Sequence, residues 1–113
     1  MPVTLFATRR YQRDVSRLLV AAERAAMEQA IGTAPEAHPV VPGTGGVRKA
    51  RWGRRGKGKR SGVRVIYYYW SPDSEVYLLT VYAKSEKVDM TVEDRRAARF
   101  FVEVLKNEKT GRR

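Results

Sequence analysis

The segment Val63–Trp70, with the sequence VRVIYYYW, constrains the fold more than any other part of the chain. Seven of its eight residues are β-branched or aromatic, and such residues favour extended strands. Apolar residues occupy both odd and even positions, which predicts a central strand covered on both faces. Arg64 is its one charged residue. Because a buried charge without a partner is very costly, Arg64 is expected to meet a carboxylate of this chain or, more economically, a phosphate from outside.

The residues before this strand carry most of the surplus positive charge. Between Arg48 and Arg64 the chain has nine lysines and arginines and no aspartate or glutamate, while the whole chain has a net charge of +11. Such a concentration is typical of a surface that binds nucleic acid or another phosphate, with a solvated loop as the alternative. The residues expected to hold RNA or ribosome backbone are Arg48, Arg54, Arg55, Lys57, Lys59 and Arg60.

Composition excludes several other classes of site. The chain has no cysteine and one histidine, His38, in a proline-rich connector, which argues against disulfides, thiolate metal sites and most zinc or Ser-His-Asp centres. The stretch from Gly53 to Lys59 resembles a phosphate-binding P-loop, but Arg60 replaces its Ser or Thr and a strand follows instead of a helix. No apolar run approaches the roughly 20 residues of a membrane span. We therefore expect a cytoplasmic protein without a metal, a cofactor or a membrane partner.

The remaining pattern predicts one α+β domain over residues 1–113, with helices packed on a small antiparallel sheet. Thr8 is a candidate N-cap, and Thr91 with Asp94 forms a capping-box-like start of the last helix. No glycine or proline divides the first helical region, so periodicity permits either one helix or a pair, ending near Gly32. In chain order we expect a strand at 3–7, helix at 8–31, strands at 47–52, 63–70 and 76–84, a helix at 91–107 and a flexible basic tail at 108–113.

Strict alternation assigns the side chains of the last strand to two faces. One face is expected to carry Tyr77, Leu79, Val81 and Ala83, and the other Val76, Leu78, Thr80, Tyr82 and Lys84. In the same way, Lys49 and Arg51 share a face of their strand. If the strand that contains Arg64 runs between these two strands, the basic residues Lys49, Arg51, Arg64 and Lys84 form one cluster on the sheet together with Tyr82.

A cation cluster of this kind can cleave RNA without histidine. The 2′-hydroxyl attacks the adjacent phosphorus, which requires a base, an acid for the leaving oxygen and cations that stabilise the developing charge. The planar fork of arginine suits bidentate phosphate contact, and a lysine crowded by other cations has a lowered pKa and can act as a base. Tyr82 can stack on a base or orient a phosphate. The carboxylates, including Asp89 and Asp94, are assigned to capping and solvation.

Several motifs in order resemble the RelE/ParE superfamily of bacterial toxins, and most closely its HigB-like, ribosome-dependent mRNA interferases. They are GTGGVRKARW, a GKGKR loop, GVRVIYYYW and LLTVYAKSEKVDMT. The resemblance implies an antiparallel sheet with an N-terminal helical pair and a C-terminal helix. It also implies metal-independent cleavage of mRNA in the ribosomal A site, giving a 2′,3′-cyclic phosphate and a 5′-hydroxyl. The partners implied are the ribosome, mRNA and a cognate antitoxin, often a helix-turn-helix DNA-binding protein.

Matched position by position, the resemblance assigns Arg64 as the ligand of the phosphate and transition state. The candidate catalytic residues are Lys49, Arg51, Arg64, Tyr82, Lys84 and Lys87. The general base stays open among the three lysines. RelE has a base-stacking tyrosine near its C-terminus and some HigB toxins use histidines, whereas Met90 and Thr91 occupy this region here. A ParE-like inhibitor of DNA gyrase and a non-catalytic RNA- or ribosome-binding module are the alternative functions.

Overall fold

The described residues form three α-helices and four strands in the order that the sequence predicts. The computed structural model describes residues 2–53 and 62–111. Its elements are β1 (Thr4–Ala7), α1 (Arg9–Leu18), α2 (Ala21–Thr33), β2 (Arg48–Trp52), β3 (Val63–Trp70), a short 3₁₀ helix (Ser71–Asp73), β4 (Glu75–Ala83) and α3 (Val92–Thr110). The predicted α+β class and the order β-α-α-β-β-β-α are confirmed.

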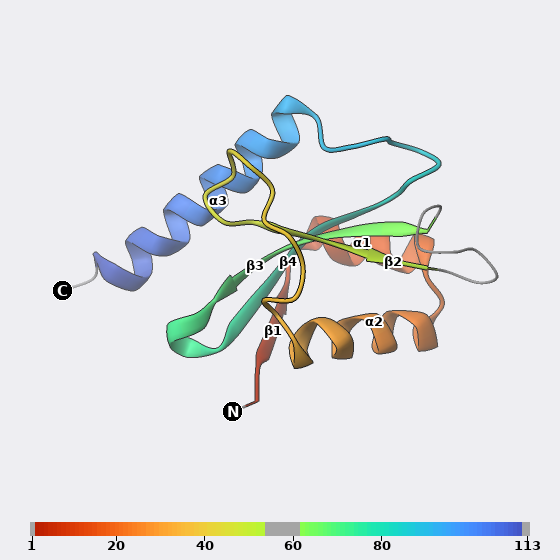
Figure 1. The fold of residues 1–113 in the computed structure, drawn as a ribbon, viewed down its shortest axis with the longest axis horizontal. Helices are drawn as coiled ribbons and strands as arrows, with labels where there is room; N and C mark the ends of the chain where they lie inside the picture. Colours follow the sequence, from red (N-terminus) through yellow and green to blue (C-terminus); the bar gives the residue numbers. More distant parts are fainter. Residues whose placement is uncertain (1, 54–61, 112–113) are drawn as a thin grey trace.

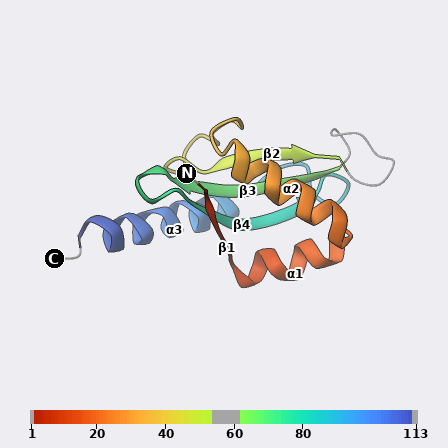
Figure 2. The same ribbon diagram turned by 90° about the horizontal axis from the view of Figure 1, so that it is seen from below.

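The sheet lies between two helical layers. α3 covers one face, and the pair α1 and α2 covers the other (Figures 1 and 2). The strand order is β1-β4-β3-β2, so β3 is an inner strand. Val65 and Tyr67 of β3 are buried against the α1–α2 layer, and Ile66 and Tyr68 against α3. The apolar character of both faces of Val63–Trp70 is explained by these two cores.

The sheet is mixed rather than wholly antiparallel. β2, β3 and β4 form the predicted antiparallel meander, whereas β1 pairs with β4 in parallel, from Thr4 opposite Glu75 to Ala7 opposite Leu78. β1 leads directly into α1, and the Thr8 amide donates to the Leu78 carbonyl at 3.1 Å. The position of α1 against β4 therefore sets the direction of β1. The alternation of side chains along a strand does not predict this direction.

The first helical region is a pair, although no glycine or proline divides it. α1 ends because Leu19 takes an extended conformation and buries its side chain in the core. Val20 is also extended and serves as the N-cap of α2, where its amide donates to Glu23 Oε1 at 3.3 Å. Burial of Leu19 and the cap from Glu23 therefore separate the two helices without a glycine or proline between them.

Two helix ends differ from the expectation. Gly32 lies inside α2, which continues to Thr33. α3 continues to Thr110, so residues 108–110 are helical rather than part of a basic tail. Lys109 stabilises this last turn, since its Nζ lies 2.8 Å from Asp73 Oδ2 and 2.7 Å from Glu75 Oε1.

A β-bulge in β4 corrects the predicted faces of that strand. Ile66 pairs with Thr80 but Tyr67 pairs with Leu78, so Leu79 is an extra residue on β4. The alternation therefore changes phase at Leu79. The α3 side receives Tyr77, Leu79 and Tyr82, and the α1–α2 side receives Val76, Leu78, Val81 and Ala83.

The Thr8 hydroxyl joins the bulge to the start of α1. As predicted, Thr8 is the N-cap and accepts from the Tyr11 amide at 3.1 Å. The same hydroxyl donates to the Leu79 carbonyl at 2.7 Å, at the residue that the bulge removes from the strand register. The Thr8 hydroxyl is therefore a hydrogen-bond partner both for the first turn of α1 and for the bulge residue Leu79.

We expect Thr8→Val to lower the free energy of unfolding by about 2 kcal/mol, because the cap and the hydrogen bond to the bulge are both lost. Thr8→Ser keeps the hydroxyl and should lie within about 0.5 kcal/mol of the parent. Urea denaturation followed by circular dichroism compares the two variants. Equal losses of unfolding free energy for Thr8→Val and Thr8→Ser would show that the Thr8 hydroxyl does not contribute to stability.

Candidate functional site

Three predicted site residues form a row across the sheet on the face that α3 covers. Arg51 of β2 lies opposite Arg64 of β3, and Arg64 lies opposite Tyr82 of β4. Cross-strand partners project to the same face, and the bulge gives Tyr82 the same phase as Arg64. Two arginines and a phenol therefore lie side by side on neighbouring strands, as the cluster hypothesis requires.

Arg64 is the buried member of this row, with 4% of its surface exposed. Its guanidinium donates to the Val63 carbonyl at 3.3 Å. Burial lowers the pKa of Arg64, and the neighbouring charge of Arg51 lowers it further. The fold thus holds a cation in an unfavourable environment, which is an arrangement found where charge serves binding or catalysis.

The Tyr82 hydroxyl is buried and has no hydrogen-bond partner within residues 2–53 and 62–111. Burial, followed by the charge of Asp89, raises the pKa of Tyr82 to about 12, although the Arg64 charge opposes this shift. The phenol therefore stays protonated at neutral pH. It can donate a hydrogen bond to an anion beside Arg64, and it is not a base.

Lys49 lies one step along the same face, and it is joined to α3 through a carboxylate. Its Nζ is 3.2 Å from Asp89 Oδ1, while Arg95 Nη2 is 3.3 Å from Asp89 Oδ2. The Met90 amide also donates to Asp89 Oδ1 at 2.7 Å. Asp89 therefore bridges a strand cation and a helix cation, which was not expected of a solvated loop residue.

Lys87 lies above the row at Tyr82. Its Nζ is 5.0 Å from the centre of the Tyr82 ring, a cation–π contact. The same Nζ is 2.6 Å from Asp94 Oδ2, and Arg10 Nη2 is 3.3 Å from Asp94 Oδ1. Asp94 also completes the predicted capping box with Thr91. It is thus both a helix cap and the partner of two cations.

Asp94 makes stability depend on pH. Burial opposes ionisation of its carboxyl, but contacts with Lys87 and the Thr91 amide lower its pKa to about 2. A carboxyl with a lowered folded-state pKa stabilises the fold above its unfolded pKa, near 4, and loses that contribution as pH falls to about 2. We expect Asp94→Asn to lower the unfolding free energy by about 2 kcal/mol at pH 7, with the difference vanishing near pH 2.

Urea denaturation of parent and Asp94→Asn across this pH range measures the effect. Glu103→Gln is the matched control, because the Glu103–Arg99 pair is exposed on both sides. It should change stability little at any pH. A loss for Asp94→Asn that does not depend on pH would contradict this role for the ionised carboxyl.

The remaining predicted residues lie apart from the row. Lys84 Nζ donates to the Val88 carbonyl at 3.0 Å and closes the turn after β4. Arg48 belongs to the opposite face, where its guanidinium donates to the carbonyls of Glu36 at 3.2 Å and His38 at 2.7 Å. It holds the proline-rich connector to β2. Five expected RNA-binding residues lie outside the described residues: Arg54, Arg55, Lys57, Lys59 and Arg60.

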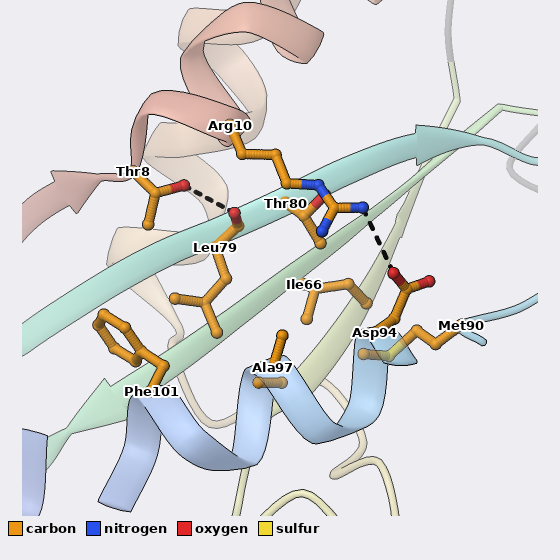
Figure 3. Close-up of a pocket in the computed structure, with 10 residues that line it drawn as sticks. Thr8, Arg10, Ile66, Leu79, Thr80, Met90, Asp94, Ala97 and Phe101 are labelled. Carbon is orange, nitrogen blue, oxygen red and sulfur yellow. Dashed lines mark hydrogen bonds and ion pairs between the residues drawn. The ribbon is translucent and has the colours of Figure 1, made fainter. Parts of the chain in front are cut away.

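An apolar cavity of about 200 Å³ lies between α3 and the sheet, and Asp94 and Arg10 are among the residues that line it (Figure 3). Ile66, Leu79 and Phe101 contribute to its walls, and the Arg10–Asp94 ion pair closes one end. Its chemistry suits apolar groups rather than phosphate. The cationic row is therefore a separate, more polar feature of the same face.

Sequence reasoning did not identify Asp89 and Arg95 as site residues. Their sequence positions give no signal, since Asp89 follows the last strand and Arg95 lies in the first turn of α3. Only the packing of α3 on the sheet brings them to Lys49. Within the described residues there is no group of three His, Cys, Asp or Glu side chains that could hold a metal ion. None of the helices described is both long and apolar enough to cross a membrane.

Comparison with known structures identifies the fold. No protein-family model matches the chain. The E. coli toxin RelE, solved as a double mutant in the free state, superimposes with a TM-score of 0.56 at 17% identity, over 78% of this chain and 90% of RelE. The chain has a RelE-like fold. The toxin–antitoxin complex RelBE2 from Mycobacterium tuberculosis gives a TM-score of 0.52 at 21% identity, over 74% of this chain and 99% of the matched chain.

Proposed function

We propose that this chain is the toxin of a type II toxin–antitoxin system and a HigB-like, ribosome-dependent endoribonuclease. The observation that carries the proposal is the row of Arg51, Arg64 and Tyr82 on a RelE-like sheet. A buried arginine, a second arginine and a protonated phenol lie on neighbouring strands, where they can offer positive charge and hydrogen-bond donors to one phosphodiester. Such preorganised donors stabilise the charge of a phosphoryl-transfer transition state.

In the proposed reaction the RNA 2′-oxygen bonds to phosphorus as the 5′-oxygen leaves. A base removes the 2′ proton, and an acid protonates the leaving oxygen, giving a 2′,3′-cyclic phosphate and a 5′-hydroxyl. Arg64 and Arg51 bind the non-bridging oxygens, and Tyr82 donates to one of them. Lys49, Lys84 and Lys87 are the candidates for proton transfer. The side chains themselves supply the positive charge, so the proposed reaction uses no metal.

The proposed partners follow from the same assignment. The toxin acts in the cytoplasm on mRNA in the ribosomal A site, and the basic segment 54–60 contacts RNA backbone. A cognate antitoxin, expected to be a helix-turn-helix DNA-binding protein, holds it inactive. The similarity to a RelBE2 chain solved in a toxin–antitoxin complex supports an antitoxin partner, without indicating its fold.

Expression of the chain alone, followed by mapping of mRNA 5′ ends, tests the proposed activity. We expect growth arrest and new 5′ ends in the reading frame that disappear when translation initiation is blocked. Arrest with intact mRNA and damaged DNA would instead indicate a ParE-like inhibitor of gyrase. Ribosome binding with neither effect would indicate a non-catalytic module.

A further inference from the structure

We propose that Lys49 and Arg95 form a second phosphate-binding pair, which the Asp89 carboxylate occupies in the free protein. The inference rests on the proposed function, since it names how RNA backbone would enter the site. RNA phosphate would replace the Asp89 carboxylate between the two cations. Asp89 would then act as an internal competitor of the substrate, and Arg95 as a further residue of the RNA-binding site.

The geometry of the ion pairs is the first support. The two oxygens of Asp89 contact different cations, Lys49 at 3.2 Å and Arg95 at 3.3 Å. A phosphodiester also presents two non-bridging oxygens on one atom, which share one negative charge, so it can bridge the same two groups. Lys49 comes from the edge strand β2 and Arg95 from α3, so the site spans two elements that the fold holds together.

The donors of Arg95 are the second support. Its Nε is buried and has no hydrogen-bond partner among the described residues, although Nη2 is paired with Asp89. The carboxylate therefore uses only part of the guanidinium fork. A phosphodiester has two ester oxygens, which are weaker acceptors, besides its two non-bridging oxygens, and arginine binds phosphate in a bidentate manner, so the Nε donor can also be used.

The exposure of the bridge is the third support. The side chains of Asp89 and Arg95 are 44% and 42% exposed, and that of Lys49 is 25% exposed. Ion pairs as exposed as these contribute little stability, so an incoming anion can displace the carboxylate. Asp89 stays attached by the Met90 amide, whose hydrogen bond is the main reason that its pKa is lowered.

The pair also lies next to the catalytic row. Lys49 lies opposite Ile66, two positions from Arg64 on β3, and the charges of Asp89 and Arg95 both act on the Tyr82 hydroxyl. Two phosphate sites on one face suit consecutive phosphates of a single RNA strand. The row would hold the scissile phosphate, and the Lys49–Arg95 pair would hold a neighbouring phosphate. In that arrangement Lys84 and Lys87 remain as the candidates for proton transfer.

Binding of a ten-nucleotide 2′-O-methyl RNA, which cannot be cleaved by 2′-hydroxyl attack, tests the pair at several salt concentrations. Fluorescence anisotropy should show that Asp89→Asn binds about three- to fivefold more tightly than the parent, since the competing charge is removed while the side-chain shape is kept. The slope of log affinity against log salt should steepen by about 0.7, as expected for one added phosphate contact on single-stranded RNA. Arg95→Ala should weaken binding and flatten the slope by a similar amount.

Matched variants separate this effect from net charge. Asp73→Asn changes the charge equally but lies at the other end of the β3–β4 hairpin, against Lys109. Arg96→Ala removes one exposed arginine next to Arg95. Asp89→Asn binding no more tightly than Asp73→Asn, including no binding by either, would overturn the proposal. The proposal would also be overturned if Arg95→Ala and Arg96→Ala had the same RNA affinity and salt dependence. A third contradicting result would be weaker RNA binding by Asp89→Asn together with a lower melting temperature, because Asp89 would then serve to stabilise the fold.

These outcomes are distinguishable from failure of the proposed function. If the parent leaves mRNA intact but Asp89→Asn tightens RNA binding, the Lys49–Arg95 phosphate site is supported and the endoribonuclease activity is contradicted. If the parent cleaves mRNA and the Asp89 and Arg95 variants bind RNA as their controls do, the endoribonuclease activity is supported and the Lys49–Arg95 phosphate site is contradicted.

Discussion

Arg64→Ala is expected to slow RNA cleavage by about 10²- to 10³-fold, which is the typical loss when one preorganised donor to a developing oxyanion is removed. Arg64 is placed for this role because it lies between Arg51 and Tyr82, and because burial keeps its guanidinium in one position. Arg64→Lys keeps the charge but loses the planar fork, so it should recover only part of the rate. Single-turnover cleavage on ribosomes programmed with a short mRNA measures both variants.

The stability of Arg64 variants provides an independent control. The lowered pKa of Arg64 means that folding disfavours its charge, so replacement by an apolar side chain of similar length should not destabilise the fold. Arg64→Met should therefore be inactive, yet unfold in urea at a midpoint no lower than that of the parent. Arg99→Ala, an exposed change of the same charge, should leave cleavage unaffected. A cleavage rate close to that of the parent for Arg64→Ala would remove Arg64 from the site.

Tyr67→Ala is expected to lower the unfolding free energy by about 3–5 kcal/mol, the usual range for removing a large aromatic side chain from a core. Tyr67 is fully buried between the sheet and the α1–α2 layer. Its hydroxyl donates to the Pro35 carbonyl at 2.7 Å, and its ring makes a T-shaped contact with the His38 ring. One side chain thus fills the core and fastens the proline-rich connector, on a chain whose total stability is about 5–15 kcal/mol.

Two comparisons separate the functions of Tyr67. Tyr67→Phe removes only the hydroxyl and should lower the unfolding free energy by about 1 kcal/mol. Tyr69→Ala makes the same truncation two residues along the same face, where the side chain is only partly buried, and should lower it by much less. Urea denaturation ranks the three variants. Equal losses for Tyr67→Ala and Tyr69→Ala would contradict the central position of Tyr67 in this core.

Local sequence pattern predicted the elements of this fold, and tertiary contacts decided their details. The run Val63–Trp70 identified an inner strand because both of its faces are apolar, and Thr8 and Thr91 identified helix starts because capping depends on adjacent residues. The parallel pairing of β1, the corner at Leu19 and the bulge at Leu79 depend on contacts between distant segments. Periodicity contains no record of such contacts.

The candidate site shows the same division. Strand order and alternation predicted that Arg51, Arg64 and Tyr82 would cluster, but the bulge at Leu79 decides the face of Tyr82, which lies with Tyr77 and Leu79 rather than with Val76 and Leu78. Asp89 and Asp94 were assigned to solvation and capping, because each has one partner that is far away in sequence, Lys49 for Asp89 and Arg10 for Asp94. Lys49 contacts Asp89 across 40 residues. A carboxylate that balances a cation cluster is found only when α3 is packed on the sheet.

The chemistry of the cut tests the central claim most directly, namely that this face of the sheet catalyses attack by an RNA 2′-hydroxyl. Ribosomes carrying an mRNA with a single 2′-O-methyl group at the scissile nucleotide can be compared with ribosomes carrying the unmodified mRNA. We predict that the unmodified mRNA gives a 2′,3′-cyclic phosphate and a 5′-hydroxyl, and that the methylated mRNA stays intact. Cleavage of the methylated mRNA at the same position, or products with a 5′-phosphate, would contradict the account.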